Sequence, residues 1–372
     1  MSRPTRAVLA TACLATLAGC TSTAPSNGTI TVTATETACE LSTTEAKAGT
    51  VTFSITNKGT SVNEFYFYGP GDRIVGEVEN IGPGLSRSLV VEVPDGGAYT
   101  SACKPGMAGD GIRAPFTVKG AATAQTAADP KLAAAVRDYR EYVEGEAKSL
   151  VTRVTTFAEA VKAGDVPQAK ALYPAARTPW ERIEPVAESF GDIDPKVDGR
   201  EDDERDPGVL FTGFHRLEKD LWVSGLQADS GAMAERLVAD VKDLADRVGQ
   251  VPLAPVQMAN GAKELLDEVA TTKVTGEEDR YSHTDLWDFA ANVEGSKKAL
   301  ATMRPALDAK NPELRRQLDT RFAAVDALLA KYRAGNGYRL YTELTPVDVK
   351  AMTEAVDALS EPVSQVAGVV TA

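Results

Sequence analysis

The hydrophobic pattern of this 372-residue chain changes period once, near residue 120. Before that point, short segments alternate apolar and polar residues and are rich in β-branched and aromatic side chains, which is typical of β-strands. After it, apolar residues recur every three or four positions over long stretches, which is typical of amphipathic helices. A chain with these two periods in succession is expected to form two domains, and its length suits that number.

Residues 28–119 are predicted to form a β-sandwich. Turn-forming segments such as Gly69–Asp72 and Pro94–Gly97 separate the apolar runs. Six to eight short strands in a segment of this length are typical of a sandwich. The expected strands are 30–35, 49–56, 63–68, 88–93, 97–101 and 114–118.

Residues 129–372 are predicted to form an all-α bundle, after a linker of small residues at 120–128. Asp129-Pro130 is typical of an N-cap followed by a first helical residue. The apolar stripe from Leu132 to Val161 predicts one long helix that ends at Gly164. Further helices are expected near 166–175, 178–190, 208–224, 230–248, 253–271, 283–306, 311–334 and 346–369.

Residues 1–19 are predicted to be an export signal. Two arginines precede an uncharged, mostly apolar run at 7–19, which is too short to span a bilayer as a helix. The run ends in Leu17-Ala18-Gly19-Cys20, which resembles a bacterial lipobox. The resemblance implies cleavage before Cys20, a lipid on its sulfur and anchorage to the outer face of a membrane, with residues 20–27 as a polar tether. The alternative is a simple secretory signal in which Cys20 occurs by chance.

The net charge of −13 and the lack of a basic run argue against nucleic acid as a partner, because phosphate neutralisation needs lysine and arginine. An acidic balance suits a cation ligand or plain solubility. With His215 and His283 as the only histidines, the chain has too few imidazoles for a multi-histidine metal cluster.

The segment Tyr99–Met107, with a cysteine four residues after a tyrosine, resembles the last loop of a cupredoxin. Blue-copper sites take their ligands from Cys, His and Met, but no histidine precedes residue 215, and Glu64 falls where the earlier histidine would lie. A type 1 copper site is therefore not expected. Cys39 and Cys103 are predicted to form a disulfide, as an even cysteine pair in an exported protein usually does.

The alternative for this β half is a metal site formed by Cys39, Glu64 and Cys103, with Glu40 as a further candidate. Mixed thiolate and carboxylate ligands could hold Cu or Fe. The disulfide and the metal site exclude each other, because an oxidised cysteine pair offers no thiolate.

The helical half contains one motif with metal-ligand spacing. His215 and Glu218 are three residues apart, so on a helix they are neighbours on one face and can share a metal ion. His-x-x-Glu alone is a weak pattern, and its alternative is a surface pair or a hydrogen-bonded core histidine.

Other acidic residues of the helical half are candidate partners. Glu181 and Glu184 repeat the three-residue spacing, although Thr178 and Glu181 also match a capping box. The loop 192–206 holds eight acidic residues, most of them expected to be solvated, of which Asp198 is a candidate to turn inward.

A third candidate lies farther along the chain. Asp285 and Asp288 share a face of the helix that Ser282 is expected to cap.

The whole chain resembles the EfeO-type components of bacterial iron uptake systems. The motifs that carry the resemblance are 179–185 (PWERIEP), 213–218 (GFHRLE) and 281–289 (YSHTDLWDF). The resemblance implies an N-terminal cupredoxin-like domain, a C-terminal imelysin-like (peptidase M75) domain, and no enzyme activity. It implies a metal site at His215, Glu218, Glu181, Glu184, Asp198 and Asp285.

The resemblance further implies that the protein captures Fe3+ or Fe2+, with Cu or Zn as other possible metals, outside the cell membrane or in the periplasm. Its implied partners are a membrane iron permease, to which it delivers iron, and a dye-decolourising-type haem peroxidase. A carboxylate and imidazole site should bind iron more weakly at acid pH, as its ligands protonate.

Two other functions are weighed against the carrier. A helical zinc protease places two histidines in His-Glu-x-x-His, whereas this motif has His215 alone, and Glu218 would have to act as both ligand and base. A copper-binding or electron-transfer protein would depend on the cysteines of the β half.

Overall fold

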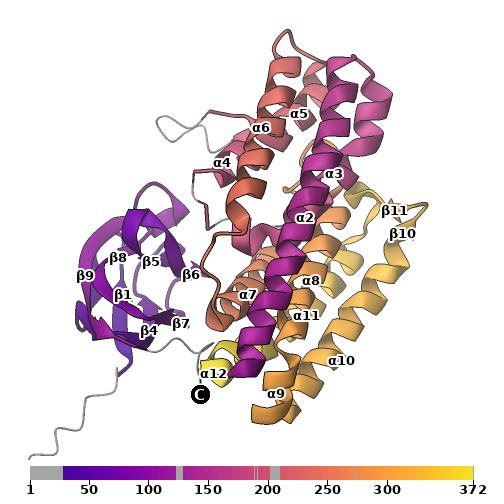
Figure 1. Cartoon of the computed structure of the whole chain (residues 1–372). Coiled ribbons are helices and arrows are strands. Elements are labelled where there is room, and N and C mark those ends of the chain that lie inside the picture. Colours follow the sequence, from indigo (N-terminus) through magenta and orange to yellow (C-terminus); the bar gives the residue numbers. More distant parts are fainter. Residues whose placement is uncertain are drawn as a thin grey trace, which may run out of the picture.

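The computed structural model describes residues 28–122, 129–187, 189–190, 192–201, 210–271 and 273–371. In these residues a β-sandwich is followed by a helical domain, as predicted (Figure 1). The export signal and Cys20 lie outside the described residues. No described helix combines the length and apolar character that a membrane crossing requires.

Two sheets pack face to face in the N-terminal domain. One has the strand order β2-β1-β4-β7 and the other β3-β9-β8-β5-β6. Alternate residues of each strand point into a shared apolar core, for example Phe53 of β4 and Phe65 and Phe67 of β5. The strands are β1 (Ile30–Ala34), β2 (Cys39–Leu41), β3 (Glu45–Lys47), β4 (Gly49–Asn57), β5 (Asn63–Tyr68), β6 (Ile74–Ile81), β7 (Ser86–Val93), β8 (Asp95–Cys103) and β9 (Ile112–Ala121).

The second domain is a bundle of helices with one small hairpin, β10 (Arg333–Ala334) and β11 (Gly337–Tyr338). Its helices are α2 (Pro130–Lys162), α3 (Val166–Ala187), α4 (Asp194–Val197), α5 (Gly213–Lys219), α6 (Ser230–Val248), α7 (Pro255–Thr271), α8 (Asp285–Thr302), α9 (Arg304–Lys310), α10 (Pro312–Leu329), α11 (Pro346–Val363) and α12 (Val366–Thr371). A π-helical segment, η4 (Asp220–Ser224), follows α5.

Helix α2 begins and ends where the sequence predicts. The Asp129 side chain accepts a hydrogen bond from the Lys131 amide at 2.8 Å, and Gly164 has the left-handed φ of 72° that stops the helix. The predicted stripe from Leu132 to Val161 lies in the main apolar core.

Helix α3 corrects the prediction of two helices and a capping box at Thr178. The helix continues through Pro179, and Thr178 Oγ1 donates to the Pro174 carbonyl instead of capping a new helix. A proline removes the N–H that would bond to the carbonyl four residues earlier. That carbonyl, of Ala175, accepts a hydrogen bond from Arg153 Nη1 at 3.1 Å, which compensates the loss. Because no helix begins at Thr178, the Glu181 carboxylate does not serve as a cap and can contact the buried cations described below.

Helix α8 begins later than predicted. Its N-cap is Thr284 rather than Ser282, because His283 has a φ of 61° and so lies outside helical backbone space. The predicted helix 311–334 likewise ends at Leu329, where the chain turns into the hairpin.

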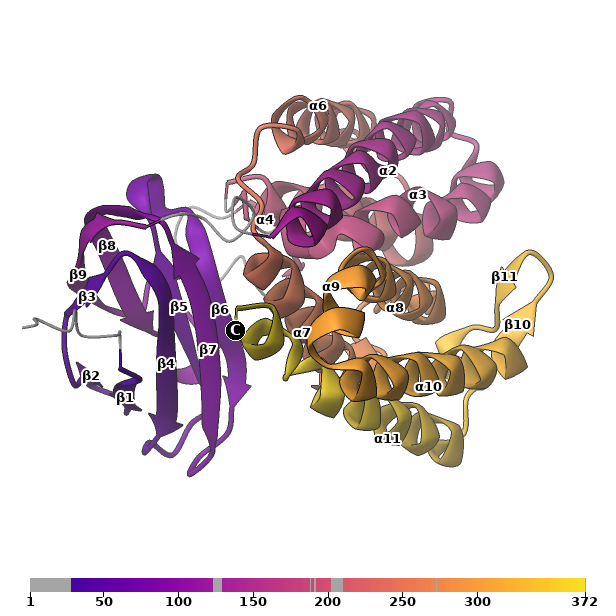
Figure 2. The same ribbon diagram turned by 60° about the horizontal axis from the view of Figure 1, so that its bottom comes forward.

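Helix α7 of the helical domain forms the contact with the sandwich. It packs against β6 and β7 of the sandwich on one side and against α8 and α11 on the other (Figure 2). Asn260 Nδ2 donates to the Val90 carbonyl at 2.7 Å across the boundary. The sandwich therefore packs along the helix that also borders the buried polar region described next.

Candidate metal centre

His215 and Glu218 contact each other as their spacing predicts. His215 Nδ1 lies 3.1 Å from Glu218 Oε2, and both side chains are buried. The other oxygen of Glu218 accepts hydrogen bonds from the backbone amides of Tyr281 (2.9 Å) and Ser282 (2.7 Å). These amides fix the carboxylate, which in turn orients the imidazole.

The other ring nitrogen of His215, Nε2, faces carboxylates from segments that are distant in the sequence. His215 Nε2 lies 3.4 Å from Asp198 Oδ1 and 3.8 Å from Glu278 Oε1. Ligand atoms of Asp198, His215 and Glu278 all lie within 4.8 Å of one another, and so do those of His215, Glu218 and Asp279. One imidazole is thus shared by two sets of oxygen donors with metal-ligand spacing.

Gly213 lets α5 approach α4 closely enough to bring His215 to Asp198. Its φ of 76° is left-handed, and an added Cβ would lie 2.2 Å from the Val197 carbonyl oxygen. Only glycine fits both the backbone conformation and the contact.

Arg177 lies at the centre of the carboxylates and is fully buried. Its guanidinium pairs with Asp198, with Glu278 at 2.9 Å and with Asp288 at 3.3 Å. It also donates to Glu181. Its Nη1 lies 3.4 Å from His215 Nε2, so a permanent positive charge occupies the space that the candidate ligands surround.

Lys273 is a second buried cation, beside the first. Its ammonium lies 2.8 Å from Glu184 Oε2 and 3.0 Å from Glu181 Oε2. Asn292 Nδ2 donates to both of these carboxylates. Glu181 therefore bridges Arg177 and Lys273, whereas Glu184 contacts Lys273 and Asn292.

The cluster contains more buried carboxyl groups than buried cations. Its carboxylates outnumber Arg177 and Lys273, the two fully buried permanent cations. Asp285 Oδ2 and Asp288 Oδ1 are buried with no hydrogen-bond partner in the described part of the chain. The carboxylates are Glu181, Glu184, Asp198, Glu218, Glu278, Asp279, Asp285 and Asp288.

Burial, together with the surplus of neighbouring carboxyl groups, raises the pKa values of several members of the cluster. Burial, reinforced by Asp279, raises the pKa of Asp285 to about 8, and burial raises that of Asp288 well above its usual range despite Arg177. Burial and Arg177 oppose protonation of His215, yet hydrogen bonds to Asp198 and Glu218 raise its pKa to about 9. Surplus carboxylates kept neutral by protons are groups that a metal cation can deprotonate and bind.

Most of the predicted metal-ligand residues lie in one buried cluster, but not all of them belong to a donor set that contains His215. Asp198 lies beside His215 and Glu218, and Glu181 forms a further candidate set with Glu278 and Asp288. Glu184 and Asp285 are buried in the same cluster but belong to neither set that contains His215. His283 is half-buried and is absent from the candidate sets of the described residues.

Glu278 and Asp279 are candidate ligands that the sequence patterns did not predict, and Arg177 and Lys273 are counter-charges that they did not predict either. The run Glu277-Glu278-Asp279 before the predicted helix start was a signal for the acidic pair. A lone arginine or lysine gives no such signal, because its burial depends on helices that meet only in the folded chain.

In the sandwich, Cys39 and Cys103 form a disulfide bond. Cys103 belongs to the apolar core together with Phe65, whereas Glu64, the neighbour of Phe65 on β5, lies on the opposite face with Tyr66. The structure therefore does not bring Glu64 to the two sulfur atoms.

Fold and site together define a two-domain protein: a β-sandwich attached to a helical domain with a buried carboxylate and imidazole cluster. Residues 7–118 match the family of cupredoxin-like domains, and residues 135–366 match the imelysin family, peptidase M75. A solved structure described as an iron-regulated protein A precursor from Parabacteroides distasonis covers 65% of this chain and 94% of its own, with a TM-score of 0.50 at 17% identity, which supports the fold.

Curated relatives cover nearly the whole chain. The iron uptake system component EfeO of Escherichia coli K12 is 42% identical over 343 residues, which span 91% of this chain and 90% of the relative. The component of the same name from Escherichia coli O157:H7 is 41% identical over the same length. The chain belongs to the EfeO family of iron uptake system components.

Proposed function

We propose that this protein is the iron-binding component of its uptake system, and that it captures iron outside the cytoplasm and delivers it to a membrane permease. The observation that carries the proposal is the pair of donor sets around His215, one with Asp198 and Glu278 and one with Glu218 and Asp279. Family membership supports iron as the bound metal, because the relatives are named for iron uptake.

The donor set suits iron. Ferric iron is a hard cation that prefers oxygen, and carboxylates with one imidazole supply oxygen donors and the negative charge that balances it. The orphaned oxygens of Asp285 and Asp288 add acceptors to the same cluster. Softer Cu(I) prefers sulfur, which the Cys39–Cys103 disulfide does not offer as thiolate.

Capture and release require the cluster to open. His215 is 2% exposed, whereas Arg200, which pairs with Glu278, is about one-third exposed. The segment after α4, which carries both Asp198 and Arg200, thus reaches from the cluster to the protein surface. We infer that an ion passes on this side and that Arg177 shifts as the ion binds.

A carrier fits this site better than a peptidase does. A catalytic zinc keeps an open coordination position for water and substrate, whereas the described cluster is closed around Arg177. We expect metal-loaded protein to leave casein uncleaved, and a His215→Ala variant to behave identically in this assay. Cleavage that disappears in the variant would favour the peptidase.

The proposal includes a membrane anchor and two partners. Lipid on Cys20 would hold the carrier beside the permease, and a dye-decolourising-type haem peroxidase would act in the same system. A Cys20→Ser variant should move from the membrane fraction to the soluble exported fraction. Retention in the membrane fraction would contradict the anchor.

The deciding experiment is iron binding by matched histidine variants. In His215→Asn the amide keeps a polar contact to Glu218 but removes the imidazole, so iron affinity should fall by at least about 10–100-fold. His283→Asn is the control, because asparagine tolerates the left-handed backbone at that position. Calorimetry under anaerobic conditions measures the iron affinity of both variants. Equal iron affinities of His215→Asn and His283→Asn would overturn the proposal.

A further inference from the structure

The short segment 198–201, which follows α4, contacts the helical cluster through its charged side chains. Asp198 Oδ1 lies 3.4 Å from His215 Nε2. Arg200, about one-third exposed, pairs with the buried carboxylate of Glu278. Asp198 and Glu278 form one donor set with His215, so the segment supplies one member of that set and holds another.

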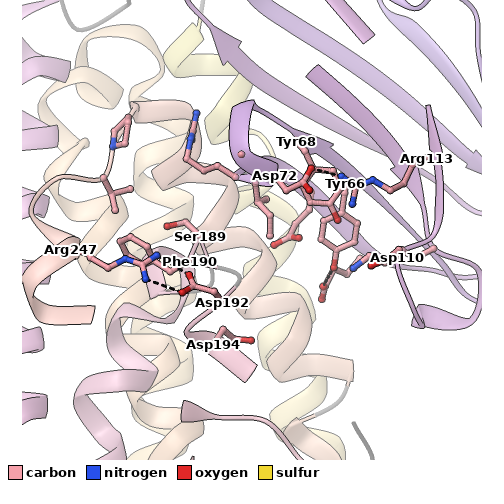
Figure 3. A pocket seen from close by; sticks show the side chains of 18 of the residues that line it. Tyr66, Tyr68, Asp72, Asp110, Arg113, Ser189, Phe190, Asp192, Asp194 and Arg247 are labelled. Atoms are coloured by element: carbon pink, nitrogen blue, oxygen red, sulfur yellow. Dashed lines mark hydrogen bonds and ion pairs between the residues drawn. The ribbon is translucent and has the colours of Figure 1, made fainter. Parts of the chain in front are cut away.

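The segment begins beside a cleft between the two domains. The cleft has a volume of about 850 Å³, with Tyr68 on the sandwich side and Asp192 and Asp194 on the helical side (Figure 3). The Asp198 amide donates a hydrogen bond to the Asp194 carbonyl at 2.9 Å, so Asp198 lies one helical turn beyond the cleft wall. An ion in the cleft can therefore approach the segment without crossing the helical bundle.

Glu201 holds the end of this segment at the protein surface. Lys219 Nζ pairs with Glu201 Oε1, and the Tyr281 hydroxyl donates a hydrogen bond to Glu201 Oε2 at 2.6 Å. The Glu201 side chain is 35% exposed and the Lys219 side chain 29%. Water competes for contacts at this exposure, so the ion pair contributes little stability and breaks readily.

The two partners of Glu201 come from the segments that carry and fix Glu218. Lys219 is the residue after Glu218 on α5, and the Tyr281 backbone amide donates to Glu218 Oε1 at 2.9 Å. Among the described contacts of Glu201, neither partner is a candidate ligand. Glu201 therefore joins the 198–201 segment to the elements that position Glu218, and its loss leaves the donor atoms themselves in place.

The other end of the segment is fixed by packing of the backbone. Thr212 Oγ1 donates a hydrogen bond to the Lys196 carbonyl at 3.0 Å, and Gly213 packs against the Val197 carbonyl. These contacts hold α4 against α5, whereas the contacts described at Glu201 are made by side chains. A movement of the segment is therefore expected at its Glu201 end, with α4 as the fixed point.

We propose that Glu201, held by Lys219 and Tyr281, is a latch that keeps the 198–201 segment closed and must release before iron enters or leaves the His215 cluster. The inference rests on the proposed function, because it names the contact that controls access to the same site. Opening moves Asp198 away from His215 Nε2. Asp198 then faces the incoming ion first and brings it to the imidazole as the segment closes.

A latch of this kind controls rates and leaves the equilibrium affinity unchanged. The Glu201 contacts are present in the closed protein both with and without iron, so their loss destabilises both closed states alike and cancels from the binding free energy. Opening precedes both entry and release of the ion, so a weaker latch speeds both steps.

The test measures iron kinetics on the full chain under anaerobic conditions. Fe2+ is the probe: tryptophan fluorescence follows loading, and a coloured ferrous chelator in excess follows release. The kinetic phase that belongs to the cluster is the one that His215→Asn removes. Glu201→Ala should speed both steps of this phase by about three- to tenfold and leave the affinity measured by calorimetry unchanged. Glu313→Ala, which removes an exposed ion pair of α10, is the control and should change nothing.

Two results would overturn the latch: loading and release rates that Glu201→Ala leaves unchanged, or faster release without faster loading, which is a plain loss of affinity. Tyr281→Phe removes one hydrogen bond of the latch and keeps the backbone amide that holds Glu218. It should speed both steps in the same direction, and it tests the latch if circular dichroism shows that Glu201→Ala is misfolded. Failure of the iron carrier proposal would show separately, as equal iron affinities of His215→Asn and His283→Asn.

Discussion

At the scale of single residues, Arg177 is the side chain on which the cluster depends. Its guanidinium pairs with Asp198, Glu278 and Asp288, and it is fully buried. A buried ion pair contributes little net stability when intact, but removing one partner leaves uncompensated charge. Arg177 therefore keeps the metal-free cluster folded, while its charge competes with any cation that binds there.

Replacing Arg177 by methionine removes the charge and keeps much of the apolar volume. We expect Arg177→Met to lower the free energy of unfolding of metal-free protein by about 3–5 kcal/mol. Iron should restore part of the loss, because it supplies positive charge at the same carboxylates. Urea unfolding with and without iron measures both effects, and Arg316→Met on the exposed face of α10 is the control. A variant as stable as wild type would show that the guanidinium is not the counter-charge.

At the scale of elements, the close approach of α4 and α5 positions the imidazole. Gly213 and Gly164 both have left-handed φ, but only Gly213 faces backbone within 4 Å of an added Cβ. Gly164→Ala thus reports the backbone strain alone, and Gly213→Ala reports the strain together with the steric contact.

We predict that Gly164→Ala costs about 1–2 kcal/mol of stability and leaves iron affinity unchanged. Gly213→Ala should cost more and should weaken iron binding, because it pushes His215 away from Asp198. Thermal unfolding and iron calorimetry on the two variants measure these effects. Equal stability losses with unchanged iron affinity in both would contradict the role of this contact.

Local patterns predicted the elements better than the site. The two hydrophobic periods predicted the β and α halves, and a three-residue spacing predicted the contact of His215 with Glu218. The break expected at Pro179 was wrong, because Arg153, a residue of another helix, compensates the missing hydrogen bond. Glu278 and Asp279 reach His215 through a chain reversal between α7 and α8, which no local pattern encodes.

At the scale of the whole molecule, buried carboxyl groups make the stability of the fold depend on pH. Burial, with Glu79 nearby, raises the pKa of Glu64 to about 8. Between the ordinary pKa of a glutamate and this value, the folded chain holds a proton that the unfolded chain has lost. The folding contribution of Glu64 is therefore largest at low pH and is lost as pH rises through this window.

The prediction is a change in relative stability with pH. In metal-free protein, the stability of wild type relative to Glu64→Gln should fall by on the order of 1 kcal/mol or more between pH 5 and pH 8, because glutamine does not titrate. Urea unfolding at several pH values measures this difference. A difference that stays constant or rises with pH would contradict a raised pKa.

The central claim is that iron binds at His215 and the carboxylates around it. Anomalous diffraction at the iron absorption edge, from crystals of iron-loaded protein, locates the ion directly. The account predicts a peak within bonding distance of His215 and of carboxylate oxygens from its two donor sets, with Arg177 displaced. A helical cluster without a peak, in crystals that contain iron elsewhere, would contradict it.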